Sequence, residues 1–278
     1  MNRPRPAIIV LHAALAAAAL VSLAPLLWLI CAAFKQPQDV FAHTFLPWRH
    51  LDQLTLSNFT TLLREQPFAR WLTNSIFLAS VYTVTVVTLS SLCGFALAKY
   101  RFTGRRPLML LMLLVMLLPA QVMLGTLYEL MNRFGWLDSY LAILVPGAVS
   151  VFGAFFFRQA MQSVPDELLQ SARLDGCGEL RLWWDIALPL VRPTTSAFAL
   201  ISFLSSWNGF LWPQIVLRDE FKYTLPLGLN NLIGQQQYQG QYGLLAAGTL
   251  LGLAPVALLF FAVQKDFLAG LTSGAIKE

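Results

Sequence analysis

The chain has 278 residues, of which 57% are hydrophobic and only 12% are charged. Soluble domains carry about 25% charged residues, so a chain with half that content cannot cover its apolar surface with polar groups. This composition excludes an ordinary soluble domain and also disordered, collagen-like and disulfide-scaffold proteins. The net charge is +5, and the basic residues concentrate in the loops on one side of the predicted spans, as they do in membrane proteins. We therefore expect a lipid bilayer, and no nucleic acid, as a partner.

Six stretches of the chain are free of charged residues and rich in apolar ones. In chain order they cover residues 7–34, 71–98, 107–128, 139–157, 193–217 and 242–263. Each is close to or above the roughly 20 residues that a helix needs to cross a bilayer, and a helix satisfies its own backbone groups in lipid. We therefore predict an all-α integral membrane protein with six transmembrane helices. The first apolar run is too long for a cleaved signal peptide, so we expect a retained anchor.

The distribution of lysine and arginine predicts the orientation of these spans. Six spans place both termini on one side of the membrane. The two tails and the connections on that side contain 12 of the 19 basic residues. Because basic residues concentrate in cytoplasmic loops, we expect a multi-pass protein of the cytoplasmic membrane with both termini inside the cell.

The spans lack the groups that would make the chain an enzyme or an ion-coupled carrier. No Asp, Glu, Lys or Arg lies well inside a charge-free run, and His12 is the only titratable candidate. The sequence holds no GxxxxGK[ST] phosphate loop and no HExxH or GxSxG motif, and its three cysteines form no metal-like pair. We therefore predict no enzyme activity, no cofactor and no bound metal. Uphill transport would take its energy from a partner.

Four uncharged side chains lie in or beside the apolar runs and are candidates for a solute path. They are Asn74, Gln121, Trp207 and Asn208. Amides are costly against lipid, so we expect them to face the interior of the helix bundle. There they would suit a polar, neutral solute, with amides hydrogen-bonding to hydroxyl groups and the indole stacking. A structural hydrogen bond between helices is the alternative for each residue, and the sequence leaves both open.

The longest predicted cytoplasmic connection, residues 163–193, has the pattern of a folded unit. A short helix begins it and is ended by Gly176 and Gly178. A second short helix is expected over residues 179–187, and Pro189 and Pro193 are expected to break the chain before the fifth span. The connection holds five acidic and three basic residues, so anionic headgroups would not attract it. We expect it to dock into another protein.

This connection resembles the EAA loop of binding-protein-dependent ABC importer permeases, whose pattern is E-A-A-x-x-x-G, nine residues, then I-x-L-P. The residues that carry or flank the pattern are Glu167, Gln170, Ser171, Ala172, Asp175, Gly176, Ile186, Leu188 and Pro189. Two positions depart from it, because Gln170 replaces the leading Glu and Ser171 replaces the first Ala. The resemblance implies that these residues couple the chain to a separate ATPase.

The resemblance extends over nearly the whole chain and is closest to the carbohydrate-uptake branch, including the smaller maltose permease subunit and the sn-glycerol-3-phosphate permease. The further matching segments are Asn74-Ser75, Leu118-Pro119, Trp207-Asn208, Trp212-Pro213 and residues 270–275. The resemblance implies a type I ABC importer core over residues 70–264. The first tail, span and external loop would occupy residues 1–69, and a cytoplasmic tail residues 265–278.

The function implied by this resemblance is ATP-driven import of a sugar or a related polyhydroxylated solute. The alternative is the same machine acting on glycerol-3-phosphate or a glycerophosphodiester. The implied partners are a second permease subunit in a heterodimer, two ABC ATPase subunits and an extracytoplasmic solute-binding protein.

The predicted external connection, residues 218–241, is rich in amides. Its last part contains Gln235, Gln236, Gln237, Tyr238 and Gln239. A solvated connector is one interpretation, because most loops are polar. The resemblance implies another, in which this loop contacts the binding protein and its amides approach the sugar cleft. The four charged residues within 218–222 would then set the docking register.

Overall fold

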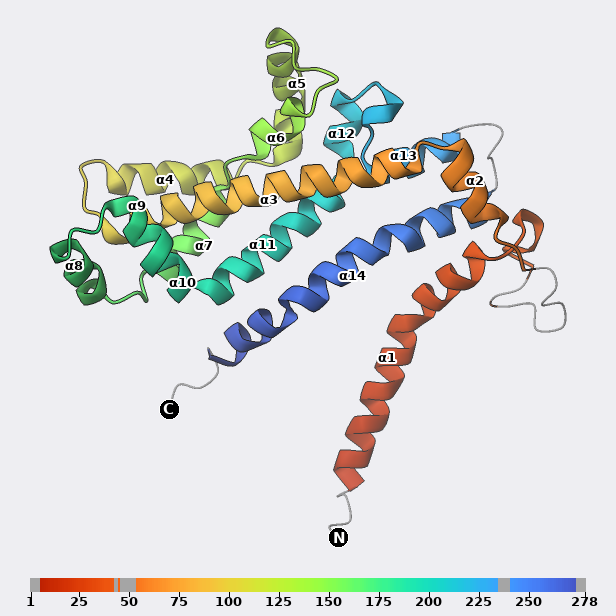
Figure 1. Ribbon diagram of the computed structural model, residues 1–278, viewed down its shortest axis with the longest axis horizontal. Helices are drawn as coiled ribbons and strands as arrows, with labels where there is room; N and C mark the ends of the chain where they lie inside the picture. Colours follow the sequence, from red (N-terminus) through yellow and green to blue (C-terminus); the bar gives the residue numbers. More distant parts are fainter. Residues whose placement is uncertain (1–5, 43–44, 46–53, 235–240, 274–278) are drawn as a thin grey trace. The chain divides into compact units, whose positions relative to one another are not determined.

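The computed structural model describes residues 6–42, 45, 54–234 and 241–273, and every regular element in these residues is helical (Figure 1). The all-α prediction is confirmed. The chain divides into two compact units, residues 1–69 with 228–254, and residues 70–227 with 255–278.

The first unit is built from apolar helices and the short elements that connect them. These are α1 (Pro6–Ala33), the 3-10 helix η1 (Pro37–Asp39), α2 (Ser57–Glu65) and the first part of α14 (Tyr242–Ser273). α1 is apolar all round and exposed over most of its length, as in a helix that meets lipid. At its end, Asn58 donates hydrogen bonds to the carbonyl oxygens of Ala33 and Lys35, at 2.9 and 2.8 Å. These bonds tie α2 to the end of α1.

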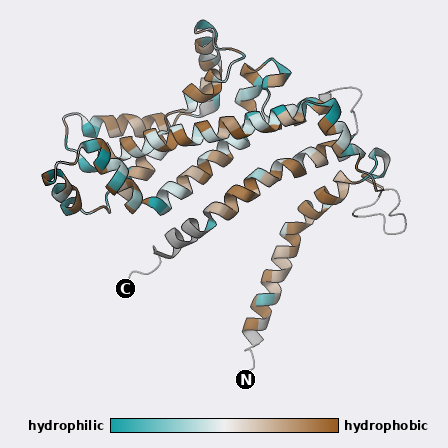
Figure 2. Cartoon of the chain, viewed as in Figure 1, coloured by the Kyte–Doolittle hydropathy of each residue, from teal (hydrophilic) through white to brown (hydrophobic). Residues whose placement is uncertain are grey.

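The second unit contains one long unbroken helix and a series of shorter ones. They are α3 (Phe68–Lys99), α4 (Arg105–Met116), the 3-10 helix η3 (Ala120–Met123), α5 (Leu124–Arg133), α6 (Leu141–Gly147), α7 (Val151–Met161), α11 (Arg192–Trp207), α12 (Leu211–Val216), the 3-10 helix η5 (Glu220–Lys222) and the start of α13 (Leu225–Gly234). Figure 2 shows that the long helices are mainly hydrophobic and that hydrophilic residues gather in the connections.

Three of the predicted spans, residues 107–128, 139–157 and 193–217, are not single helices. α4 and α5 are bent by 87° across η3, α6 and α7 by 43°, and α11 ends at Trp207. Among the described residues, only α1, α3 and α14 are long and apolar enough to cross a membrane alone. Counting each of three bent pairs as one span gives up to six, where the third pair joins residues 179–190 to α11 at 89°.

Local chemistry explains these interruptions. Pro119 lies in an extended conformation before η3, and a proline cannot donate the backbone hydrogen bond that would continue a helix. Pro146 lies near the end of α6, and the side chain of Ser150 caps α7 by accepting a hydrogen bond from the N–H of Gly153 at 3.0 Å. Charge-free runs located the spans in the sequence, but they do not reveal where a helix is interrupted within a run.

The core of the second unit lies where α3, α7 and α11 meet. Its buried side chains include Phe95, Phe157, Met161 and Phe198. The rings of Phe157 and Phe198 meet edge to face, with their centres 5.5 Å apart. α3 lies close against α7 at Gly94, where an added Cβ would lie 2.5 Å from the Cβ of Phe157. Glycine at this position therefore permits a backbone contact that any side chain would obstruct.

Candidate functional site

Residues 163–193, which we name the coupling loop, fold as a compact helical unit. It consists of α8 (Asp166–Leu174), α9 (Glu179–Arg181), the π-helix η4 (Leu182–Ala187) and α10 (Leu188–Leu190). Gly176 follows α8 with a φ of +82°, and the N–H of Cys177 donates to the carbonyl oxygen of Ala172 at 2.9 Å. The predicted helix with a glycine terminus is confirmed, because a positive φ favours a residue without a Cβ.

The expected chain break before the fifth span lies between Pro189 and Pro193, but not at Pro189 itself. Pro189 lies inside α10, and the sharp bend follows two residues later at Val191, between α10 and α11. A proline ring crowds the carbonyl group four residues before it in an α-helix. Here the preceding turn is a π-helix, in which the N–H of Leu188 bonds to the carbonyl oxygen of Trp183, five residues back. The wider turn accommodates the proline and lets the helix continue.

Lys99, the last residue of α3, holds the beginning of the coupling loop. Its side chain is only 6% exposed, although the residue ends a long helix. The ammonium group donates to the carbonyl oxygen of Val164 at 2.5 Å and to Asp166 Oδ1 at 2.7 Å. The hydrogen bond from Lys99 lowers the pKa of the Asp166 carboxyl. The long helix α3 and the start of α8 are therefore connected by a charged joint.

A second joint connects the next residue of the chain with both arms of the coupling loop. The hydroxyl of Tyr100 donates to a carboxylate oxygen of Glu179, and Arg173 Nε donates to Glu179 Oε1 at 2.9 Å. The guanidinium of Arg173 also lies 5.8 Å from the centre of the Tyr100 ring. Arg173 and then Tyr100 lower the pKa of Glu179, so this carboxylate stays charged near neutral pH. α8, α9 and the end of α3 thus share one polar cluster.

The residues predicted to couple the chain to an ATPase lie mainly on the exposed surface of the loop. Glu167, Gln170, Ser171, Asp175, Gly176 and Pro189 are exposed, and Ala172, Ile186 and Leu188 are half-buried. Leu174 and Trp184 are apolar but 90% and 59% exposed. Leu169 and Leu182, by contrast, are buried in the core beside α3 and α7. One face of the coupling loop is fixed to the helix bundle, and the other, which carries apolar and polar side chains, is not covered by any described residue.

The four predicted path residues have different environments. Trp207 is buried and stacks on Phe203 with ring centres 5.7 Å apart. Gln121 and Asn208 are exposed, and each lies at an interruption between helices, Gln121 in η3 and Asn208 after α11. Among the described contacts, no hydrogen bond or ring contact joins one of the four to another. Exposed amides at two helix breaks are the part of the arrangement that suits a polar path.

Asn74 has a structural contact that favours the alternative interpretation for this residue. Its amide donates to the carbonyl oxygens of Phe221 and Tyr223, at 2.9 and 3.0 Å. One turn earlier, the indole of Trp71 donates to the carbonyl oxygen of Glu220 at 2.9 Å. The start of α3 thus holds the beginning of the predicted external loop by its polar side chains.

A further contact holds the same loop to the connection after α5. Asp138, a non-glycine residue with a φ of +57°, accepts hydrogen bonds from the backbone N–H groups of Arg218 and Asp219, at 2.9 and 3.0 Å. Lys222 Nζ lies 2.6 Å from Asp138 Oδ2. Burial raises the pKa of Asp138, but the bonds from Lys222 and the two N–H groups lower it more, to about 2. The sequence suggested a docking role for the charges within residues 218–222, and one of them, the ammonium of Lys222, is engaged within the chain.

The amides predicted to approach a binding protein, residues 235–239, lie outside the described residues. The apolar segment before them forms α13, as expected for a stretch that folds locally.

The comparisons with known proteins agree with the resemblance of the coupling loop. A family model described as "Binding-protein-dependent transport system inner membrane component" matches residues 86–267, well over half of the chain. The chain belongs to this family. It is a multi-pass permease subunit of an ABC importer, a transport subunit rather than an enzyme.

Two curated relatives and one solved structure illustrate the similarity. The permease is 36% identical over 260 residues to the arabinooligosaccharides transport system permease protein AraQ of Halalkalibacterium halodurans, covering 93% of this chain and 92% of AraQ. It is 34% identical to the sn-glycerol-3-phosphate transport system permease protein UgpE of Yersinia pestis, covering 74% and 73% of the two chains. A chain from the crystal structure of a bacterial ABC transporter that imports alginate superposes with a TM-score of 0.82, at 24% identity, covering 96% of the permease and 99% of that chain, which supports the fold.

Sequence analysis missed the joints that attach the coupling loop to the permease. Lys99 and Asp166 are 67 residues apart in sequence, and Tyr100 and Glu179 are 79 apart. The only signal was a lysine and a tyrosine directly after an apolar run, which is also what a membrane interface requires. Their partners follow from the fold alone.

Proposed function

We propose that the permease imports a sugar, as one half of a transmembrane path, and takes the energy from ATP hydrolysis in separate subunits. The partners would be a second permease subunit, two ABC ATPase subunits and an extracytoplasmic solute-binding protein. Both termini would lie in the cytoplasm, on the side with more basic residues. The observation that carries the proposal is the coupling loop. Its inner face is fixed to α3 by Lys99 and Tyr100, and its outer face is exposed as far as the described residues go.

The exposed face of the coupling loop is the proposed docking surface for the ATPase. Apolar side chains such as Leu174 and Trp184 are costly in water and are typical of a surface that another protein covers. Gln170 lies beside them on exposed helix surface, so an amide would make the contact that the resembling family makes with a glutamate. Movement of the ATPase would reach the bundle through the two joints to α3, because Lys99 and Tyr100 leave α8 and α9 little freedom to move separately.

The proposed path uses the two helix breaks. Backbone without regular helix is tolerated at membrane depth only where it is buried in protein or lines a water-filled cavity. Gln121 and Asn208 are exposed at such breaks, and both carry neutral amides. Trp207 would form the wall behind Asn208 through its stack on Phe203. Asn74 would contribute at the outer end, where it fixes the loop beginning at residue 218.

The outer end of the path would receive solute from a binding protein. The beginning of the loop at residue 218 is anchored by Asp138 and Asn74, and the binding protein would meet the far part of this loop. That far part contains the amide-rich residues 235–241, and we propose that they approach the sugar cleft of the binding protein. Replacing residues 234–240 by a Gly/Ser linker of equal length should lower the ATPase activity stimulated by the binding protein and leave basal activity near normal.

Neutral amides favour a sugar over glycerol-3-phosphate, which carries a phosphate group and would require a cation at the site. The test is ATP-dependent uptake by the assembled transporter in vesicles, with arabinooligosaccharides and sn-glycerol 3-phosphate offered separately. We expect uptake of the oligosaccharide, and an Asn208→Leu variant should lose about ten-fold in rate, equivalent to about 1.4 kcal/mol, while assembling normally. Uptake of glycerol-3-phosphate alone would support the alternative. Loss of assembly would make Asn208 a packing residue.

A further inference from the structure

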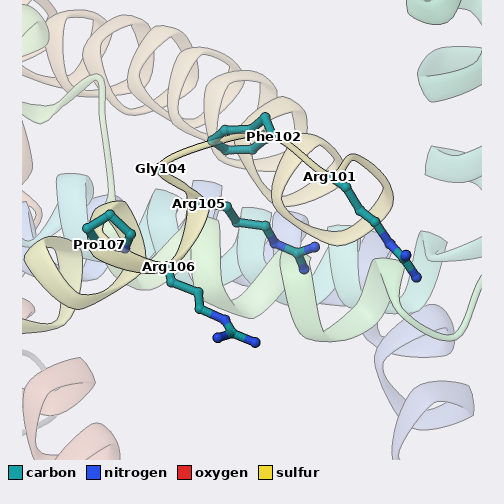
Figure 3. A pocket seen from close by; sticks show the side chains of 6 residues that line it. All are labelled: Arg101, Phe102, Gly104, Arg105, Arg106 and Pro107. Atoms are coloured by element: carbon teal, nitrogen blue, oxygen red, sulfur yellow. The ribbon is translucent and has the colours of Figure 1, made fainter.

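A cavity of about 560 Å³ lies at the turn between α3 and α4. The residues that line it are Arg101, Phe102, Gly104, Arg105, Arg106 and Pro107, which we name the arginine pocket (Figure 3). Figure 3 shows Arg105 and Arg106 extending in nearly the same direction, with Arg101 beside them. Gly104 has a φ of +92°, and this left-handed conformation makes the tight turn that brings the three arginines together.

The charges of the arginine pocket are not balanced within the described part of the chain. No ion pair or hydrogen bond joins Arg101, Arg105 or Arg106 to a carboxylate there. Arg105 donates from Nη1 to the carbonyl oxygen of Tyr100 at 3.3 Å, and its Nε is buried without a hydrogen-bond partner. This Nε is too buried to meet a ligand, so the donors open to an anion are chiefly the guanidinium groups of the exposed Arg101 and Arg106. The acidic group near Arg101 is Asp166, which already binds Lys99.

The surface next to the arginine pocket is apolar. α4 begins at Arg105 and has no buried residue, and Leu110, Leu111 and Leu114 are each about three-fifths exposed. Phe102, at the rim, is 44% exposed. A phospholipid would match this arrangement, because its charged headgroup could lie at the cationic pocket while its acyl chains lie along the exposed apolar side chains of α4.

We propose that the arginine pocket binds the phosphate of an anionic phospholipid. Guanidinium groups match a phosphate with paired hydrogen bonds, and three of them line this pocket. The first turn of α4 adds little, because the N–H of Arg105 already donates to the carbonyl oxygen of Phe102 at 3.3 Å and Pro107 has no N–H. The pocket lies at the end of α3 that carries the coupling loop, as Lys99 and Tyr100 show. A lipid bound there would belong to the leaflet next to the ATPase side.

The test uses the purified full chain in a neutral detergent, with bound lipid measured by native mass spectrometry during titration. The probes are dioleoylphosphatidylglycerol, dioleoylphosphatidylcholine and inorganic phosphate. We expect phosphatidylglycerol to bind at least about ten-fold more tightly than phosphatidylcholine. The triple variant R101Q/R105Q/R106Q should weaken phosphatidylglycerol binding by about 100-fold, because each arginine near an anionic lipid contributes about a five-fold factor.

Two further variants separate the pocket from general effects of charge and folding. R101Q/R106Q changes only the two exposed arginines and should weaken binding by about 25-fold on the same reasoning. The matched control R64Q/R70Q/R133Q removes three exposed arginines elsewhere and should leave the affinity within about two-fold. Equal affinities for the two lipids, or unchanged binding in R101Q/R106Q, would overturn the proposal. Displacement of phosphatidylglycerol by inorganic phosphate would make the ligand a free phosphate and would also overturn it.

Discussion

Replacing Gly94 by alanine tests whether the close contact between α3 and α7 holds the permease together. An added Cβ at this position would meet the Cβ of Phe157 at 2.5 Å, the backbone N of Arg158 at 2.7 Å and the backbone C of Phe157 at 2.8 Å. These atoms belong to the backbone or lie next to it, so no side-chain rotation relieves the overlap. Ordinary carbon contacts lie near 3.5–4.0 Å, so the helices must separate by about 1 Å.

The expected cost follows from two opposing effects. Overpacking of this kind destabilises by about 1–3 kcal/mol. Alanine inside a helix recovers up to about 1 kcal/mol relative to glycine, so the net loss in the free energy of unfolding is about 1–2 kcal/mol. For a chain of this size, this loss lowers the thermal midpoint by about 2–8 °C.

The assay is thermal unfolding of the purified permease in detergent, with Gly125→Ala as the matched control. Gly125 also lies in a helix, α5, but an added Cβ there has no neighbour within 4 Å. The control should therefore melt at or slightly above the wild type. If Gly94→Ala melts together with Gly125→Ala, α3 and α7 do not depend on close contact at this position.

Three more predictions concern the joints and turns around the site. Gly176→Ala should lower the free energy of unfolding by about 1 kcal/mol, since the added Cβ has open space and only the positive φ is strained. Copurification of the ATPase with this variant should fall. Unchanged recovery of the ATPase with Gly176→Val would contradict the docking proposal. Lys99→Met should lower the free energy of unfolding by about 1–3 kcal/mol, because it leaves the Val164 carbonyl and the Asp166 carboxylate without this donor. Uptake per ATP hydrolysed should also fall, and Lys99→Arg should restore part of it. Equal coupling in both variants would argue against transmission through this joint. Because the pKa of Asp138 is lowered to about 2, its contribution is complete above about pH 4 and is lost as the pH falls toward 2. Asp138→Asn should therefore lower stability by about 1 kcal/mol at pH 7, a figure reduced for partial exposure, and a difference in thermal midpoint that does not shrink near pH 2 would count against the assignment.

The sequence predicted the parts of the fold that local composition determines. Charge-free runs located the membrane segments, and the pair of glycines predicted the turn at Gly176. The breaks were missed because charge-free composition continues through Pro119 and Asn208 without change. Pro189 was misread because a π-helix absorbs its ring, and nothing local distinguishes that turn from a helix end. For Asn74 the sequence offered two roles, and its observed partners, the carbonyl groups of Phe221 and Tyr223, lie about 150 residues away.

The π-helix of the coupling loop changes the direction in which side chains point around the helix axis before and after it. A π turn holds one residue more than an α turn, and one residue corresponds to about 100° of rotation and about 1.5 Å of rise in an α-helix. The residues of α9, which come directly before Leu182, are therefore rotated by that amount relative to α10. Deleting one residue within 182–187 would restore an α-helix and rotate one side against the other. The wide turn thus fixes which way the loop faces relative to the helix that it continues into.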